Sequence, residues 1–139
     1  MNLYAIEFST AYHYDTLKTG ITLPVTLGYN SRTVDFEAKL DTGSSHCIFE
    51  RRFGENLGLE IENGTLEKFG TATDGFFAYG HEIVLTVLEI ETVATVYFAK
   101  EDWFTRNVLG RQGWLDRVKL GLIDYEGKLL LSAYEGNGE

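Results

Sequence analysis

Asp41 is the side chain of this sequence best suited to acid–base chemistry, because it opens a short polar stretch just after an alternating strand pattern. The stretch is Asp41-Thr42-Gly43-Ser44, within "AKLDTGSSH". A carboxylate that transfers protons must be held in one geometry by donors to its oxygens. Gly43 has no Cβ to keep the loop backbone away from the acid, and Ser44 offers a hydroxyl close to the carboxylate. The alternative is that Asp41 is a polar turn residue that closes the strand.

Other catalytic or metal-binding side chains do not cluster in the sequence. The three histidines (His13, His46 and His81) are far apart and lack the spacing of metal ligands. His46 and Cys47 are neighbours, and neighbouring residues of an extended strand point to opposite faces, so they do not predict a Cys–His catalytic pair. We expect no metal site, and we expect Cys47 to be a small buried apolar residue. A phosphate loop of the actin or sugar-kinase type needs two α/β halves, for which the chain is too short.

The elements that would position Asp41 are mostly strands. Apolar residues alternate along 21–40, interrupted by the turn residues "GYNS", which predicts a hairpin whose second strand ends at Asp41. A second hairpin is predicted over 81–99, and a third over 120–134 around "DYEGK". Pro24 suggests that the first hairpin has an unpaired backbone position there, as on a sheet edge.

Two short helices complete the expected elements. Phe53 and Leu57 are four residues apart in "ERRFGENLG", with Gly58 as a C-terminal stop. In "RQGWLDRVK" (111–119), apolar residues are spaced to share one helix face. The predicted class is therefore mainly β with one or two short helices.

Size and composition limit the functional classes. The 139 residues fit one domain, 1–139, and 44% of them are hydrophobic, as in an ordinary globular chain. The net charge of -9 argues against nucleic acid or an anionic membrane as a partner. The chain has one cysteine, no long apolar run and an N-terminus unlike a signal peptide. These features predict a cytoplasmic location.

Three segments together resemble the retropepsin-like aspartic proteases. "KLDTGSS" is similar to the active-site loop of that family, and "RNVLGRQGWLD" is similar to its second signature of two apolar residues and a glycine. Between them, "FGTATDGFFAYGHEIVL" occupies the place of the family's flap hairpin. The likeness covers about residues 21–134, in the family's order, and is greatest to bacterial retropepsin-like proteins with one Asp-Thr-Gly motif per chain.

The resemblance implies a closed, β-barrel-like retropepsin (acid protease) fold with a flap hairpin, and a homodimer that cleaves a peptide or protein substrate. Two facing acids share one proton and take different roles, so the single motif requires Asp41 from each of two chains. The resemblance implies no cofactor and no metal. The residues implied for catalysis are Asp41, Thr42, Gly43 and Ser44. Those implied for substrate binding at the flap are Thr73, Asp74, Gly75, Phe76 and Phe77, and those implied for the dimer or its supporting structure are Leu109, Gly110 and Arg111.

This chain departs from the retroviral pattern at two positions. Ser44 replaces an alanine, and Ser45 replaces the acid that usually pairs with the arginine after the second-signature glycine. Arg111 occupies that arginine position without the usual acidic partner. The alternative is that Arg111 is an ordinary exposed arginine, which would need no acidic partner. Phe76 and Phe77 could instead be ordinary core residues of a strand. Two functions stay open: an aspartic endopeptidase, or a non-catalytic dimeric β module that binds peptides or a partner protein.

Overall fold

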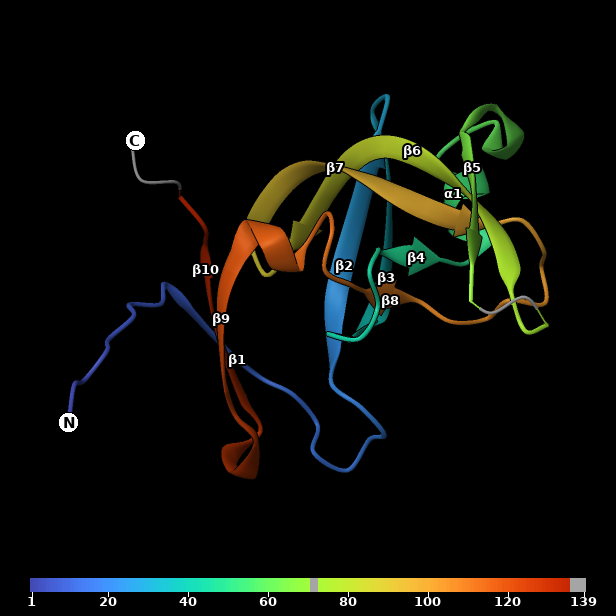
Figure 1. Ribbon diagram of the computed structural model, residues 1–139. Helices are drawn as coiled ribbons and strands as arrows, with labels where there is room; N and C mark the ends of the chain where they lie inside the picture. The colour runs from blue at the N-terminus through green and yellow to red at the C-terminus, as the bar shows by residue number, and fades with distance from the viewer. Residues whose placement is uncertain (71–72, 136–139) are drawn as a thin grey trace.

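The structure is a computed structural model that describes residues 1–70 and 73–135. In these residues, strands greatly outnumber helices (Figure 1), so the prediction of a mainly β chain is confirmed. The elements in chain order are β1 Thr10–His13, β2 Thr22–Tyr29, β3 Arg32–Leu40, β4 Ile48–Phe49, α1 Arg51–Asn56, η1 Ile61–Asn63, β5 Thr65–Phe69, β6 Phe76–Val87, β7 Ile90–Ala99, β8 Val108–Leu109, η2 Leu115–Arg117, β9 Val118–Ile123, η3 Asp124–Glu126 and β10 Lys128–Ala133.

The larger sheet curves round and closes on itself. Its strand order is β2-β3-β8-β4-β7-β6-β5, and β2 also pairs with β6 through Val25–Gly28. The alternating apolar residues of β2, β6 and β7 point inward and are buried together with Phe49, Phe98 and Trp114. Pro24 lies just outside the stretch of β2 that pairs with β6, where no ladder hydrogen bond is needed from it.

The two long hairpins are those expected from the sequence. β2 and β3 pair from Thr22–Lys39 to Tyr29–Arg32, and the two residues between them, Asn30 and Ser31, both have positive φ. Positive φ at both central residues is the two-residue turn whose twist matches that of paired strands. β6 and β7 are joined in the same way through Leu88 and Glu89.

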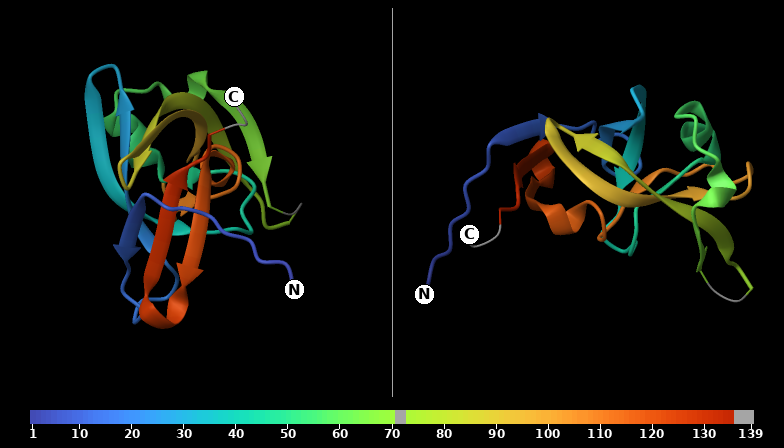
Figure 2. Two further views of the ribbon diagram at one scale, coloured as in Figure 1. Left: turned by 90° about the vertical axis from the view of Figure 1, so that its left-hand side faces the viewer. Right: turned by 90° about the horizontal axis from the view of Figure 1, so that it is seen from above.

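A second sheet lies at the opposite end of the molecule from the β5–β6 tip (Figure 2), in the order β1-β10-β9. β9 and β10 form the predicted closing hairpin, with η3 and Gly127 at its turn. β1 pairs with the other side of β10, so both edges of the C-terminal strand are occupied within the chain. No element is predicted from the sequence in residues 1–20, so β1 is an addition to the expected strands.

The helical predictions are half right. α1 forms as expected, and the Gly58 N–H donates to the Glu55 carbonyl where the helix ends. The helix expected over 111–119 is wrong: only the short 3₁₀ turn η2 forms, and Val118 already belongs to β9. Gly113 has a φ of +100°, which a helix cannot contain, and Val118 pairs with Ala133. Among the described residues, no helix has the length and apolar character to cross a membrane.

Candidate active site

Asp41 is positioned by the insertion of β8 between β3 and β4. β8 runs parallel to β3, with Leu40 opposite Leu109, and antiparallel to β4, with Ile48 opposite Val108. The segments that carry the two sequence motifs therefore lie side by side, although almost 70 residues apart in sequence. The Asp41 N–H donates to the Leu109 carbonyl at 3.0 Å, which extends this pairing to the acid itself.

The two loops beyond these strands are also hydrogen-bonded to each other. The backbone N–H groups of Arg111 and Gln112 donate to the carbonyls of Ser44 and Ser45, both at 2.9 Å. Gly110 makes this approach possible, because a Cβ built on it would lie 2.2 Å from the His46 carbonyl oxygen. Leu109 and Gly110 are buried in this crossing.

The Asp41 carboxylate is half-buried and is held by its own loop. The Gly43 N–H donates to Asp41 Oδ1 at 2.9 Å, and the Ser44 N–H donates to the Asp41 carbonyl at 3.1 Å. Gly43 lies close enough that a Cβ on it would be 3.3 Å from Oδ1. The loop therefore fixes one carboxylate oxygen, as general acid–base chemistry requires.

The two hydroxyls of the loop do not act on Asp41. We expected the Ser44 hydroxyl to lie close to the carboxylate as a donor, but it donates to the His46 carbonyl at 2.7 Å. Ser44 thus stabilises the turn that leads into β4. Thr42 is exposed, and its hydroxyl makes no hydrogen bond to residues 1–70 or 73–135. This leaves the Thr42 hydroxyl accessible to another chain.

Asp41 lies at one side of a pocket of about 220 Å³, called the apolar pocket below for the aromatic and aliphatic side chains that line part of it. The pocket brings the Asp41 loop together with β4, β8, the β5–β6 hairpin and the segment between β7 and β8. The residues that line it are Asp41, Gly43, Ser44, Ser45, Ile48, Phe69, Gly70, Phe76, Phe104, Arg106 and Val108. An acid beside an apolar pocket can both bind an apolar side chain and act on the backbone attached to it.

The tip of the β5–β6 hairpin lies next to this pocket. Thr73, Asp74 and Gly75 line a neighbouring hollow of about 340 Å³ together with residues 103–106. Residues 71 and 72, which the flap motif includes, lie outside the described residues. The hairpin tip and residues 103–106 therefore lie on two sides of this hollow, and the hollow and the neighbouring pocket together are called the cleft below.

The two phenylalanines behind the tip have different surroundings. Phe76 is half-buried and lines both hollows. Its ring stacks on Phe69 with centroids 5.6 Å apart and packs at a tilt against Phe104 at 4.6 Å. Phe77 is 40% exposed and lies near the ammonium groups of Lys68 and Lys100, outside both hollows. Phe77 does not have the position expected of a substrate contact, because successive strand residues point to opposite faces.

An aromatic cluster that the sequence did not predict joins the hairpin to the Asp41 loop. The His46 ring packs edge-on against Phe69 and Tyr97 at 5.2 and 5.1 Å, and Phe69 also contacts Tyr97. Burial raises the pKa of the Tyr97 hydroxyl. The three residues come from three separate segments, so only the pairing of strands brings them together.

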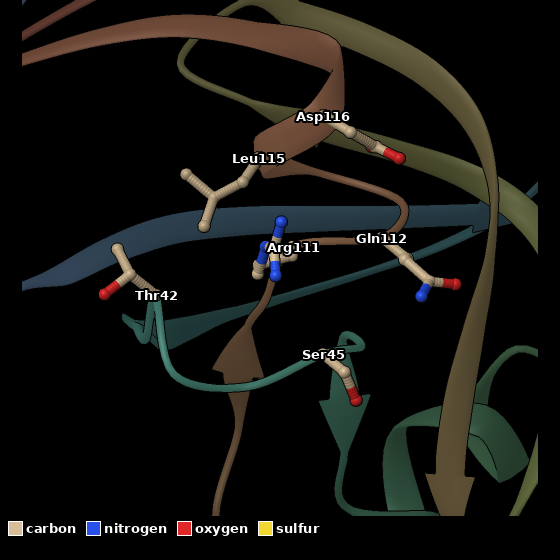
Figure 3. Close-up of a pocket in the computed structure, with 6 residues that line it drawn as sticks. All are labelled: Thr42, Ser45, Arg111, Gln112, Leu115 and Asp116. Atoms are coloured by element: carbon tan, nitrogen blue, oxygen red, sulfur yellow. The ribbon is translucent and has the colours of Figure 1, made fainter.

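Arg111 lies on the other side of the Asp41 loop from the apolar pocket. Figure 3 shows its side chain in the middle of a hollow of about 400 Å³. The hollow is lined by Thr42, Ser45, Arg111, Gln112, Leu115 and Asp116. The Arg111 guanidinium forms no ion pair with residues of the described ranges, because Asp116 instead caps the Gly113 N–H at 3.0 Å and contacts Arg117.

The cysteine thiol and the potential metal ligands are the two other groups that could take part in chemistry. Cys47 is fully buried in the core, and burial raises the pKa of its thiol to about 11. Within the residues that the structure describes, no three His, Cys, Asp or Glu side chains are placed to hold a metal ion.

No protein-family model matches this sequence, and no curated protein matches it. Among solved structures, a retropepsin-like aspartic protease from Rickettsia conorii matches with a TM-score of 0.61 and 16% sequence identity. The match covers 94% of this chain and 96% of the other. The fold is that of a retropepsin-like aspartic protease. In this retropepsin-like fold, the crossing of β8 between β3 and β4 is the feature that holds the Asp41 loop in place.

Proposed function

We propose that this chain is an aspartic endopeptidase whose active site forms between two copies, each contributing Asp41. The observation that carries the proposal is the placement of Asp41: its Oδ1 accepts the Gly43 N–H at 2.9 Å beside an apolar pocket. The retropepsin-like fold supports the same activity. The sequence has one Asp-Thr-Gly motif, so the second carboxylate comes from a second copy.

A pair of carboxylates provides the chemistry that one carboxylate lacks. Two acids in contact cannot both ionise at low cost, so one keeps a proton and the other is charged. The charged Asp41 takes a proton from water as the water oxygen attacks the peptide carbonyl carbon. The protonated Asp41 gives its proton to the carbonyl oxygen, which forms a neutral diol. The C–N bond then breaks as the nitrogen takes a proton from the protonated carboxyl group. One diol hydroxyl gives its proton to the charged carboxylate, which leaves a carboxylic acid and an amine and returns one proton to the pair.

The exposed surface next to Asp41 suits such an assembly. Thr42 and Arg111 border the same hollow, and both have polar groups without partners in the described residues. In the proposed dimer, the Thr42 hydroxyl bonds to the partner's loop and the Arg111 region supports the contact. The symmetric contact of two identical surfaces is the commonest form of homodimer.

The β5–β6 hairpin is proposed to act as a flap that closes over an extended peptide. Its tip and residues 103–106 line the same hollow, and Phe76 contributes to the pocket beneath it. Closure would exclude water and give backbone hydrogen bonds to the substrate. Phe76, rather than Phe77, is the expected apolar contact.

The test is peptide cleavage by purified protein, followed by mass spectrometry of the products. We expect cleavage by the wild type, inhibition by a statine-containing peptide that mimics the diol, and no cleavage by Asp41→Asn. Asn keeps the size of the side chain but cannot accept a proton at its amide. Cleavage that persists in Asp41→Asn at the wild-type rate would contradict the proposal.

A second candidate function is a non-catalytic dimeric module that binds peptides or a partner protein. The observation that favours it is Arg111, which has Ser45 where the retroviral enzymes have an acid. This hypothesis predicts that Asp41→Asn binds peptides as well as the wild type and that neither protein ever forms a product.

A further inference from the structure

Arg106 is the cation that recurs around Asp41. It belongs to the segment between β7 and β8, and it lines the apolar pocket, the hollow at the hairpin tip and a third hollow of about 370 Å³. Asp41 lines the first and the third of these, so the two residues border the same cleft from different segments. Neither the apolar pocket nor the hollow at the hairpin tip is lined by another Lys or Arg.

The Arg106 side chain is held at the edge of the cleft by its own segment. Its guanidinium carbon is 5.2 Å from the centroid of the Phe104 ring. Phe104 is buried and packs against Phe76, so the ring below the guanidinium is itself fixed. A guanidinium stacked on a fixed ring has lost part of its freedom before any ligand binds, which favours recognition of a planar anion.

The guanidinium is exposed and forms no ion pair with a carboxylate of the described residues. Arg52, by contrast, is paired with Glu50 at 3.0 Å. Arg106 therefore has its hydrogen-bond donors available to a ligand in the cleft. A planar guanidinium binds a carboxylate with two parallel hydrogen bonds.

We propose that Arg106 is a specificity-determining residue that selects peptides with an acidic side chain close to the cleaved bond. The body of the pocket is apolar, through Ile48, Phe69 and Phe76, and takes a large apolar side chain. Arg106 at its edge takes the carboxylate of a Glu or Asp near that residue. The proposal rests on the proposed function for the statement that a peptide occupies this cleft, and it adds the substrate class.

This local preference opposes the charge of the whole chain. A net charge of -9 repels acidic peptides at long range. The long-range repulsion is screened by salt, whereas a paired contact inside the cleft is screened less. The preference for an acidic residue is therefore expected to persist at moderate ionic strength, where the general repulsion fades.

The test uses eight-residue peptides with a central Phe–Phe pair, in which each flanking position in turn is Glu, Gln or Lys. For the wild type, one position is expected to favour Glu over Gln by about fivefold in kcat/KM, the scale of a well-placed exposed ion pair. In Arg106→Gln the Glu:Gln ratio at that position falls to about one. In Arg106→Glu the same position favours Lys over Gln.

The matched control is Arg32→Gln, which removes the same charge at the far end of β3 from Asp41. This variant is expected to keep the wild-type ratio. A Glu preference that Arg106→Gln retains, or the absence of a Glu preference at every position, would overturn the role of Arg106 while leaving the peptidase proposal intact.

Binding of the same peptides to Asp41→Asn, measured by calorimetry, separates the two proposals. If the wild type cleaves nothing but Asp41→Asn prefers Glu peptides in an Arg106-dependent way, the peptidase proposal fails and the recognition by Arg106 stands. If no peptide is cleaved and none binds, both proposals are wrong.

Discussion

Gly110 lies so close to His46 that a Cβ atom on it would be 2.2 Å from the His46 carbonyl oxygen. This contact lets β8 enter between β3 and β4 and brings the Leu109 carbonyl to the Asp41 N–H. The position of the candidate catalytic acid therefore depends on a glycine almost 70 residues further along the chain.

Gly110→Ala is expected to lower the free energy of unfolding by about 3 kcal/mol, because the added methyl group meets backbone atoms that cannot move aside. Urea unfolding measures the effect. Gly28→Ala is the control, since its nearest contact would be 3.7 Å away. Its expected change is within about 1 kcal/mol. Equal stability of the two variants would show that the loops do not approach as closely as described.

Phe76→Ala and Phe77→Ala form a matched pair of adjacent residues on opposite faces of β6. Phe76 packs against Phe69 and Phe104, so its loss is expected to destabilise the protein by about 2 kcal/mol and to raise KM for apolar peptides. Phe77 is 40% exposed, so its loss is expected to change stability by less than about 1 kcal/mol. Denaturant unfolding and peptide kinetics test both. A larger effect of Phe77→Ala on KM would reverse the assignment of the two faces.

The Cys47 thiol is expected to resist modification in the folded protein. Burial raises its pKa to about 11, so at pH 8 about one thiol in a thousand is ionised, and reagents cannot reach it. Reaction with a chromogenic disulfide should be slow in buffer and fast in denaturant. If the native thiol reacts as fast as the denatured one, Cys47 is not buried as described.

Acid is expected to weaken the contact between α1 and η1. The Arg51 guanidinium donates two hydrogen bonds to the Glu62 carboxylate, at 2.7 and 2.9 Å, which lowers the pKa of Glu62 below its ordinary value of 4.5. A group with a lowered folded-state pKa adds stability above its unfolded-state pKa and loses it as the pH falls through the folded-state pKa.

Glu62→Gln should therefore be less stable than the wild type at neutral pH, and the difference should shrink as the pH falls below 4.5. Thermal unfolding across this range measures it. Glu91→Gln is the control, since Glu91 is exposed and forms no ion pair in the described residues. A pH-independent difference for Glu62→Gln would mean that the ion pair does not contribute to stability.

Local sequence signals were enough to predict the hairpins and the close approach of Gly43 to Asp41. Asn30 and Ser31 lie at a turn between alternating runs, and Gly43 lies beside the acid; these features act within a few residues. The helix expected over 111–119 failed for the opposite reason. The pairing of Val118 with Ala133 is a contact at long range that outweighs the local spacing of apolar residues.

The surroundings of the site depended on contacts between distant segments and could not be predicted. Arg106 is separated from Asp41 by 65 residues, and only the pairing of β8 with β3 brings the two to one cleft. The donation from Ser44 to the His46 carbonyl depended on the direction of a turn. A signal for Arg106 existed in the sequence, since it is the one cation in "EDWFTRN" and the first residue of the second motif.

The measurement that tests the central claim most directly mixes two versions of the chain. Wild type and Asp41→Asn are unfolded together, refolded at varied ratios, and assayed for cleavage of a peptide that the wild type cleaves. If each active site needs Asp41 from both copies, a mixed dimer is inactive, and the activity per wild-type chain falls in proportion to the wild-type fraction. Activity per wild-type chain that is the same at every ratio would show that one chain carries a complete site, and would contradict the account.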